Sequence, residues 1–160
     1  MKDRDNSVAA MEAQATAGNI EAQFKLGLMY FSGLNVLQDY REASRWFLLA
    51  AKRGHPKAQF NLGVMYSNGL GVNLDYAEAA TMFRKAAEKG YDKAQWNLGI
   101  IYERGLGVPQ DWAEAYKWFH LAAMQKYDDA NKACQRAIVN MTQEQIAEGQ
   151  RRAAAFVLRR

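Results

Sequence analysis

The chain has little of what most small functional sites are built from. Its 160 residues include one cysteine, Cys134, and two histidines, His55 and His120, so neither a disulfide framework nor a Cys and His metal site is predicted. No apolar run approaches the about 20 residues that span a bilayer, so no membrane span is expected. Neither charge dominates, because 21 Lys and Arg against 17 Asp and Glu leave a net charge of +4. A charge this small and this dispersed does not predict binding to nucleic acid.

Two features of the sequence bear on the location of the protein. The first seven residues mix both charges and lead into no apolar segment, so no secretion signal is predicted. A lone cysteine is compatible with a reducing compartment, and we expect a cytoplasmic protein. A periplasmic or secreted location stays open as the alternative, if a signal peptide was removed before residue 1.

Proline is also scarce, with two residues, whereas alanine is abundant, and this balance favours helices. The alanines belong to an internal repeat with a period of 36 residues. It reads Ala-Gln-Phe-Lys-Leu-Gly-Leu-Met-Tyr at 22–30, Ala-Gln-Phe-Asn-Leu-Gly-Val-Met-Tyr at 58–66 and Ala-Gln-Trp-Asn-Leu-Gly-Ile-Ile-Tyr at 94–102. A period of this length indicates stacked structural units, each burying its apolar face against the next.

Apolar spacing predicts two helices in each repeat. In the second repeat, residues 58–66 and 76–87 each place apolar residues on one face of a helix, with a Gly-Leu-Gly-Val turn between them. Acidic pairs three residues apart, such as Asp111 and Glu114, predict capping boxes at the second helices, and Thr142 with Gln145 predicts one more. A catalytic carboxylate pair would be needed once, so the recurrence favours caps.

These signals divide a single repeat domain, residues 1–160, into nine helices. The predicted parts are an N-terminal half repeat at 7–17, full repeats at 20–53, 56–89 and 92–125, a degenerate first helix at 128–139 and a C-terminal capping helix at 142–158. Glycines 27, 63 and 99 lie mid-helix, where each costs about 1 kcal/mol relative to alanine. We expect close approach of the small Ala50, Ala86 and Ala122 of the second helices to offset that cost.

The Ala-x-x-x-Leu-Gly-x-x-Tyr core, the Gly-Leu-Gly-Val loop and the Asp-Tyr-x-Glu-Ala helix start resemble Sel1-like repeats, which are related to tetratricopeptide repeats. The resemblance covers about residues 8–139, and the run at 141–150 resembles the terminal helix of bacterial members. It implies an all-α fold, a right-handed α/α superhelical solenoid, and a role as an adaptor or scaffold in protein–protein interaction. One secreted branch of the family closes each repeat with a disulfide, and the single cysteine argues against that branch.

No residue pattern indicates chemistry. His55 begins a helix, His120 lies within one, and no nucleophile motif surrounds either, so both are interpreted as surface or packing residues. Cys134 is interpreted as a small buried apolar residue. Three of the four tryptophans align with apolar residues of other repeats, which is typical of core. We therefore expect no enzyme activity, no cofactor and no metal.

The resemblance places a partner-binding surface more sharply. In such a solenoid the first helices line the concave side, and the residues that face away from the second helix point into it. Asparagine can donate and accept hydrogen bonds with a peptide backbone, and cations can pair with carboxylates. This row of polar side chains on the first helices, called the stripe below, also resembles the clamp with which tetratricopeptide proteins hold acidic C-terminal peptides. The predicted partner-binding residues are Lys25, Lys57, Asn61, Val64, Asn68, Lys93, Asn97, Ile100 and Arg104.

Two alternatives to this peptide or protein partner stay open. An immunity or antagonist protein, for example one acting on a bacterial secretion-system effector, would use the Gly-Leu-Gly-Val loops instead of the groove. A small-ligand binder or enzyme would need a nucleophile, metal set or phosphate loop that the sequence lacks. The oligomeric state also stays open, because solenoid ends can stack when a cap is incomplete.

Overall fold

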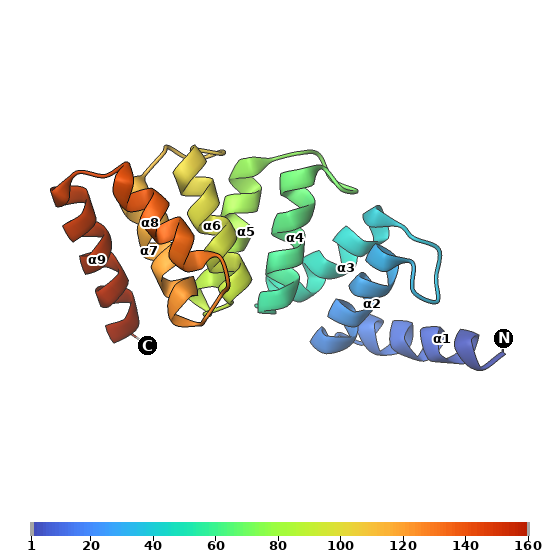
Figure 1. Cartoon of the computed structure of the whole chain (residues 1–160). Coiled ribbons are helices and arrows are strands. Elements are labelled where there is room, and N and C mark those ends of the chain that lie inside the picture. The colour runs from blue at the N-terminus through green and yellow to red at the C-terminus, as the bar shows by residue number, and fades with distance from the viewer. Residues whose placement is uncertain (1, 160) are drawn as a thin grey trace. The chain divides into compact units, whose positions relative to one another are not determined.

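The computed structural model describes the backbone of residues 2–159 and the side chains of residues 8–159. Over this range the chain is all helical and divides into two compact units, the first ending at Asp75 and the second beginning at Tyr76 (Figure 1). The nine helices of the described residues are α1 (Lys2–Thr16), α2 (Ile20–Ser32), α3 (Tyr40–Lys52), α4 (Pro56–Asn68), α5 (Tyr76–Glu88), α6 (Asp92–Arg104), α7 (Trp112–Met124), α8 (Ala130–Val139) and α9 (Gln143–Leu158). The prediction of an all-α repeat fold is confirmed, and α1 begins earlier than residue 7.

The first unit contains α1 to α4, in which each helix packs on the one before it. Ala15, Ala22, Leu26 and Trp46 form one buried cluster there. Phe47 is fully buried, and its ring centroid lies 6.0 Å from that of Phe24.

The second unit contains α5 to α9, and α7 is its centre. It packs against α6, α8 and α9, and its Ala115, Tyr116 and Phe119 form a buried cluster with Ala133 and Cys134 of α8. The C-terminal helix α9 docks on α7, where a side chain at Gly149 would meet Tyr116 Cδ1 at 2.9 Å. The two helices therefore approach too closely for a larger residue at this point.

Capping explains most helix starts. The Asp39 carboxylate accepts hydrogen bonds from the backbone N–H groups of Arg41 and Glu42, and the Asp111 carboxylate accepts one from Glu114. Of the predicted capping boxes, the one at Thr142 and Gln145 forms in both directions. The Thr142 hydroxyl accepts from the Gln145 backbone N–H, and the Gln145 side chain accepts from the Thr142 backbone N–H. At the start of α7 the Glu114 carboxylate is held by other side chains, described below, so the predicted box is only half formed there.

The expected close approach of the second helix is confirmed at two of the mid-helix glycines, Gly27 and Gly99, where the nearest atoms belong to a phenylalanine ring. A Cβ atom at Gly27 would lie 2.6 Å from the Phe47 ring, and one at Gly99 would lie 2.5 Å from the Phe119 ring. Both phenylalanines are fully buried, so their rings cannot yield. In these two repeats the phenylalanine ring of the second helix therefore packs directly against the backbone of the first helix at the glycine.

A buried glutamine recurs in every repeat, and the sequence reasoning gave it no role. Gln23, Gln59 and Gln95 each donate a side-chain hydrogen bond to a backbone carbonyl eight residues earlier, at the end of the preceding helix. Last-turn carbonyls have no partner within their own helix, so the glutamine satisfies one of them. Its recurrence on the buried side was the signal that could have shown this.

Candidate functional site

The predicted partner-binding residues of the first unit lie on exposed or half-exposed sides of α2 and α4. Lys25, Lys57 and Asn68 are exposed, and Asn61 and Val64 are half-buried. Two of these residues are used internally: Lys25 pairs with Glu21 at 3.8 Å, and the Asn68 amide donates to the Val64 carbonyl at 2.8 Å. Within the part of the chain that the structure describes, the side chains of Lys57 and Asn61 have no polar partner.

The predicted residues of the second unit lie on α6. Lys93 and Arg104 are exposed, and their charged groups have no ion-pair partner among the described side chains. The Asn97 amide donates one N–H to the Lys93 backbone carbonyl at 2.8 Å, which leaves its oxygen and its second N–H for a partner. Ile100 is half-buried and packs against the cluster that α7 forms with α8. The two cations are thus the groups of this stripe most available for contact.

An ion pair that the sequence reasoning missed lies beside this stripe. Arg136 of α8 donates to both carboxylate oxygens of Glu103, at 2.6 and 2.9 Å, and Glu103 is 8% exposed. These hydrogen bonds raise the pKa of Arg136 above its ordinary value. The signal was a departure from the repeat, since Phe31 and Ser67 stand in the column of Glu103. The pair links α8 to α6 at the C-terminal end of the α6 stripe, next to Arg104.

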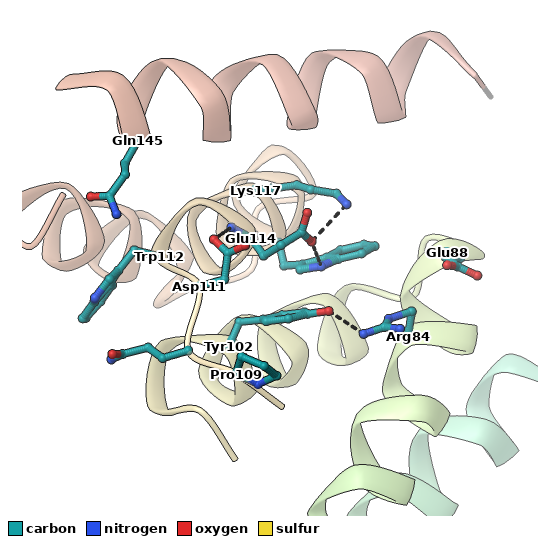
Figure 2. Close-up of a pocket in the computed structure, with 11 residues that line it drawn as sticks. Arg84, Glu88, Tyr102, Pro109, Asp111, Trp112, Glu114, Lys117 and Gln145 are labelled. Atoms are coloured by element: carbon teal, nitrogen blue, oxygen red, sulfur yellow. Dashed lines mark hydrogen bonds and ion pairs between the residues drawn. The ribbon is translucent and has the colours of Figure 1, made fainter. Parts of the chain in front are cut away.

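A polar pocket of about 660 Å³ opens on another side of the second unit (Figure 2). At its centre the Glu114 carboxylate accepts hydrogen bonds from Lys117 Nζ at 3.2 Å and from Trp118 Nε1 at 3.1 Å. The Lys117 ammonium also lies 4.3 Å from the centroid of the Trp118 ring. The pocket is lined by Arg84, Glu88, Tyr102, Pro109, Gln110, Asp111, Trp112, Glu114, Lys117, Trp118 and Gln145.

Arg152 of α9 completes this ion cluster. It donates to Asp111 at 2.9 Å, to Glu114 at 3.1 Å and to Glu148 at 2.7 Å. Burial acts to raise the pKa of Asp111, but the Glu114 backbone N–H and Arg152 outweigh it and hold that pKa below its ordinary 3.8. The Asp111 interactions therefore contribute stability above about pH 4 and lose it as pH falls through the lowered value. The cluster's groups satisfy one another, which is the arrangement of a structural anchor for α9.

The histidines and the cysteine have packing roles, as predicted. His55 Nδ1 accepts a hydrogen bond from the Ala58 N–H and caps α4, while its ring stacks on Phe24 with centroids 4.4 Å apart. The ring of His120 stacks on Tyr116. Burial raises the pKa of the Cys134 thiol to about 11, so it stays protonated at neutral pH.

The cap at His55 gives a testable prediction, because Asn19 occupies the same repeat position and caps α2 through its side chain. We expect His55→Ala to lower the free energy of unfolding by about 1 kcal/mol or more, through loss of the cap and of the ring stack. His55→Asn is expected to keep the cap and to lose the ring stack and the 3.3 Å contact of Nε2 with Glu21 Oε2. Chemical denaturation should therefore rank the variants wild type, Asn, Ala, and equal losses for Asn and Ala would contradict the capping role.

Among the described residues, no cluster of three or more His, Cys, Asp or Glu side chains has a geometry that could hold a metal ion. The described helices include none with the length and apolar character needed to cross a bilayer.

Comparison with known proteins decides the family. A family model described as Sel1 repeat matches residues 20–55, 56–91 and 92–127. The chain belongs to the Sel1 repeat family. Sel1 repeat proteins are typically protein–protein interaction modules, and the matched segments contain every residue of the predicted stripes.

Solved Sel1 repeat structures support the fold. A Sel1 repeat protein from Oxalobacter formigenes is 38% identical, with 81% of this chain and 98% of that chain covered and a TM-score of 0.74. A protective antigen of uropathogenic Escherichia coli that displays an SLR fold is 43% identical over 77% of this chain and 26% of its own, also with a TM-score of 0.74. Cysteine-rich protein B of Helicobacter pylori is 21% identical, with 82% of this chain and 94% of its own covered and a TM-score of 0.63, and it shares the fold.

A curated plant protein also contains similar sequence. The HRD3A component of an ERAD-associated E3 ubiquitin-protein ligase from Arabidopsis thaliana is 40% identical over 53 residues. The match covers 32% of this Sel1 repeat chain and 8% of the plant protein. This chain therefore spans only a small part of that relative, and about a quarter of the Escherichia coli antigen.

Proposed function

We propose that this Sel1 repeat protein is a non-enzymatic adaptor that binds an acidic peptide or protein segment on the exposed stripes of its first helices. The observation that carries the proposal is the set of polar groups without an internal partner on those stripes. Lys57 and Asn61 on α4 are available in this way, and so are the cations of Lys93 and Arg104 on α6. The family supports the general role, because Sel1 repeat proteins are typically interaction modules.

The chemistry of the stripes favours an acidic, extended partner. Lysine and arginine donate charge-assisted hydrogen bonds to carboxylates, which are stronger than bonds between neutral groups. An asparagine with a free amide can donate to a peptide carbonyl and accept from a peptide N–H, and so can hold an extended backbone. Stripe residues that are already paired, such as Lys25 and Asn68, contribute less.

Alanine substitution of both asparagines tests this proposal. We expect Asn61→Ala with Asn97→Ala to weaken partner binding by well over tenfold while helicity stays unchanged, because both side chains lie outside the core. Asn61→Ala alone should cost more than Asn97→Ala, since the Asn97 amide is already bonded to Lys93. The partner is first captured from the native cell and identified, and its affinity for each variant is then measured by calorimetry.

The matched control is Asn131→Ala, which removes an exposed asparagine of α8 outside the stripes. It should leave the affinity unchanged. Wild-type affinity in a folded Asn61 and Asn97 double variant would contradict the proposal.

A second candidate function is an antagonist that inserts a loop into its target, and exposed leucines of the first unit favour it. Leu37 is 91% exposed in the loop between α2 and α3, at a position where the other repeats have Asn73 and Pro109. Leu34 and Leu74 are exposed on the loops of the same unit. If Leu37→Ser abolishes binding while the asparagine variants do not, the loop contact replaces the stripe contact.

A further inference from the structure

The polar pocket beside the ion cluster presents hydrogen-bond donors that the chain does not use. The indole N–H of Trp112 and the side-chain N–H groups of Gln145 have no acceptor among the described residues. The Tyr102 hydroxyl accepts a hydrogen bond from Arg84, and its own proton has no acceptor there either. Arg84 has no carboxylate partner in the described part of the chain. All four side chains line the same pocket, and Figure 2 shows the Gln145 amide pointing from α9 toward Trp112.

The central acceptors of this pocket are already occupied. The Asp111 carboxylate accepts from Arg152 and from a backbone N–H of α7. The Glu114 carboxylate accepts from Arg152 and from two neighbouring side chains of α7. The Gln110 amide donates to a backbone carbonyl of α6, which leaves its oxygen as a free acceptor. At its centre the pocket therefore offers donors rather than acceptors to a ligand.

The surfaces between these donors are rings. Trp112 and Tyr102 are half-buried, and Pro109 of the loop before α7 is exposed and lines the same pocket. Two cations and three carboxylates line the pocket, so it has no excess of positive charge that would select an acidic partner. A ligand that fits this lining is uncharged, presents acceptors and has apolar surface to place against the rings.

The repeat fold does not require these lining residues. At the position of Arg84 the other second helices have Leu48 and His120, and Trp112 stands where both earlier repeats have tyrosine. The pocket is therefore a feature of the third repeat and not of the 36-residue pattern.

We propose that this pocket binds a proline-rich segment of a protein partner in the polyproline II conformation. Proline has no backbone N–H, so such a segment presents carbonyl acceptors with few donors, which complements the pocket. Those carbonyls have no partner within a polyproline II helix, and grooves lined by aromatic side chains recognise it. The Trp112 indole and the Gln145 amide donate to the carbonyls, while the rings of Tyr102 and Pro109 contact the prolines. The site does not depend on the stripes of the first helices.

The test measures the binding of labelled decaproline to the full chain by fluorescence anisotropy. Decaproline should bind at least fivefold more tightly than a ten-residue peptide in which alanine replaces every second proline, because each alanine restores a backbone N–H and loosens the helix. Trp112→Phe keeps a ring but removes the indole N–H, and should weaken decaproline binding at least fivefold. Gln145→Glu keeps an oxygen for the cap of α9 but removes the donor, and should weaken binding at least threefold.

The matched control is Trp96→Phe, because Trp96 does not line the pocket and both earlier repeats have phenylalanine at its position. It should bind decaproline as the wild type does, and so should Asn61→Ala with Asn97→Ala, which separates this site from the stripes. Circular dichroism checks that every variant folds.

Three results would overturn the proposal: no binding of decaproline at millimolar concentration, equal binding of the two peptides, or unchanged binding in the folded Trp112→Phe variant. Tighter binding of decaglutamate than of decaproline would also overturn it, by making the occupant acidic.

Discussion

Gly99→Ala is expected to destabilise the chain by about 2 kcal/mol, as an overpacked core residue does. Helix propensity alone predicts the opposite sign, a gain of about 1 kcal/mol for replacing a mid-helix glycine with alanine. The structure decides between them, because the new methyl group would lie 2.5 Å from the ring of Phe119, which is fully buried. Equilibrium denaturation in urea measures the sign directly.

The control for this prediction is a double-mutant cycle with Phe119→Leu. The smaller side chain gives the methyl group room, so the double variant should be more stable than the sum of the two single effects. Additive effects, or a higher melting temperature for Gly99→Ala, would show that the glycine and the ring do not compete for space.

Gln95→Glu alters the side-chain volume very little, yet we expect it to lower the free energy of unfolding by about 3 kcal/mol. Gln95 is 1% exposed, donates to the Ala87 carbonyl at 3.2 Å and accepts from the Gln125 amide at 2.8 Å. A glutamate would bury a carboxylate against that carbonyl, which repels it, and the carbonyl would lose its donor. Thermal and urea unfolding should both report the loss.

Gln135→Glu is the matched control, because Gln135 is exposed on α8. It should change the free energy of unfolding by less than about 0.5 kcal/mol, as surface substitutions do. Gln95→Met keeps the volume without the charge, and we expect a smaller loss of about 1 to 3 kcal/mol. Equal stability of Gln95→Glu and wild type would mean that the buried hydrogen bond contributes nothing.

The sequence predicted those parts of the fold that depend on local spacing. The helices follow the apolar period, and the reciprocal cap at Thr142 and Gln145 forms. Each of these features depends on residues close together in the chain, so a repeated pattern is enough to reveal it.

Contacts between distant residues were not predicted. The sequence showed that Gly99 needs a close neighbour on the second helix, but not that the Phe119 ring lies nearest to it, because Phe119 and Ala122 both recur from repeat to repeat. The ion pair of Glu103 with Arg136 and the anchoring of α9 by Arg152 join residues more than thirty positions apart. In the sequence, the only signal of these ion pairs was that single charged residues depart from the repeat pattern.

The repeat period alone placed the stripe residues on the exposed sides of their helices. Only the structure shows which of them have no hydrogen-bond or ion-pair partner within the chain. The repeat period assigned Asn61 and Asn97 the same role in partner binding. The hydrogen bond from Asn97 to Lys93 distinguishes them, and so does the packing of Ile100 against the α8 cluster. The Asn97 bond lies within α6 itself, whereas Ile100 packs against a cluster that includes Ala133 and Cys134 of α8, the helix that departs from the repeat pattern.

The most direct test of the central claim is a map of backbone amide chemical shifts, by NMR, while the captured partner is added to the labelled chain. We predict that the largest shifts fall on α4 and α6, around Lys57, Asn61, Lys93 and Arg104. Shifts confined to the loops at residues 33–39, 69–75 and 105–111, with α4 and α6 unchanged, would contradict it.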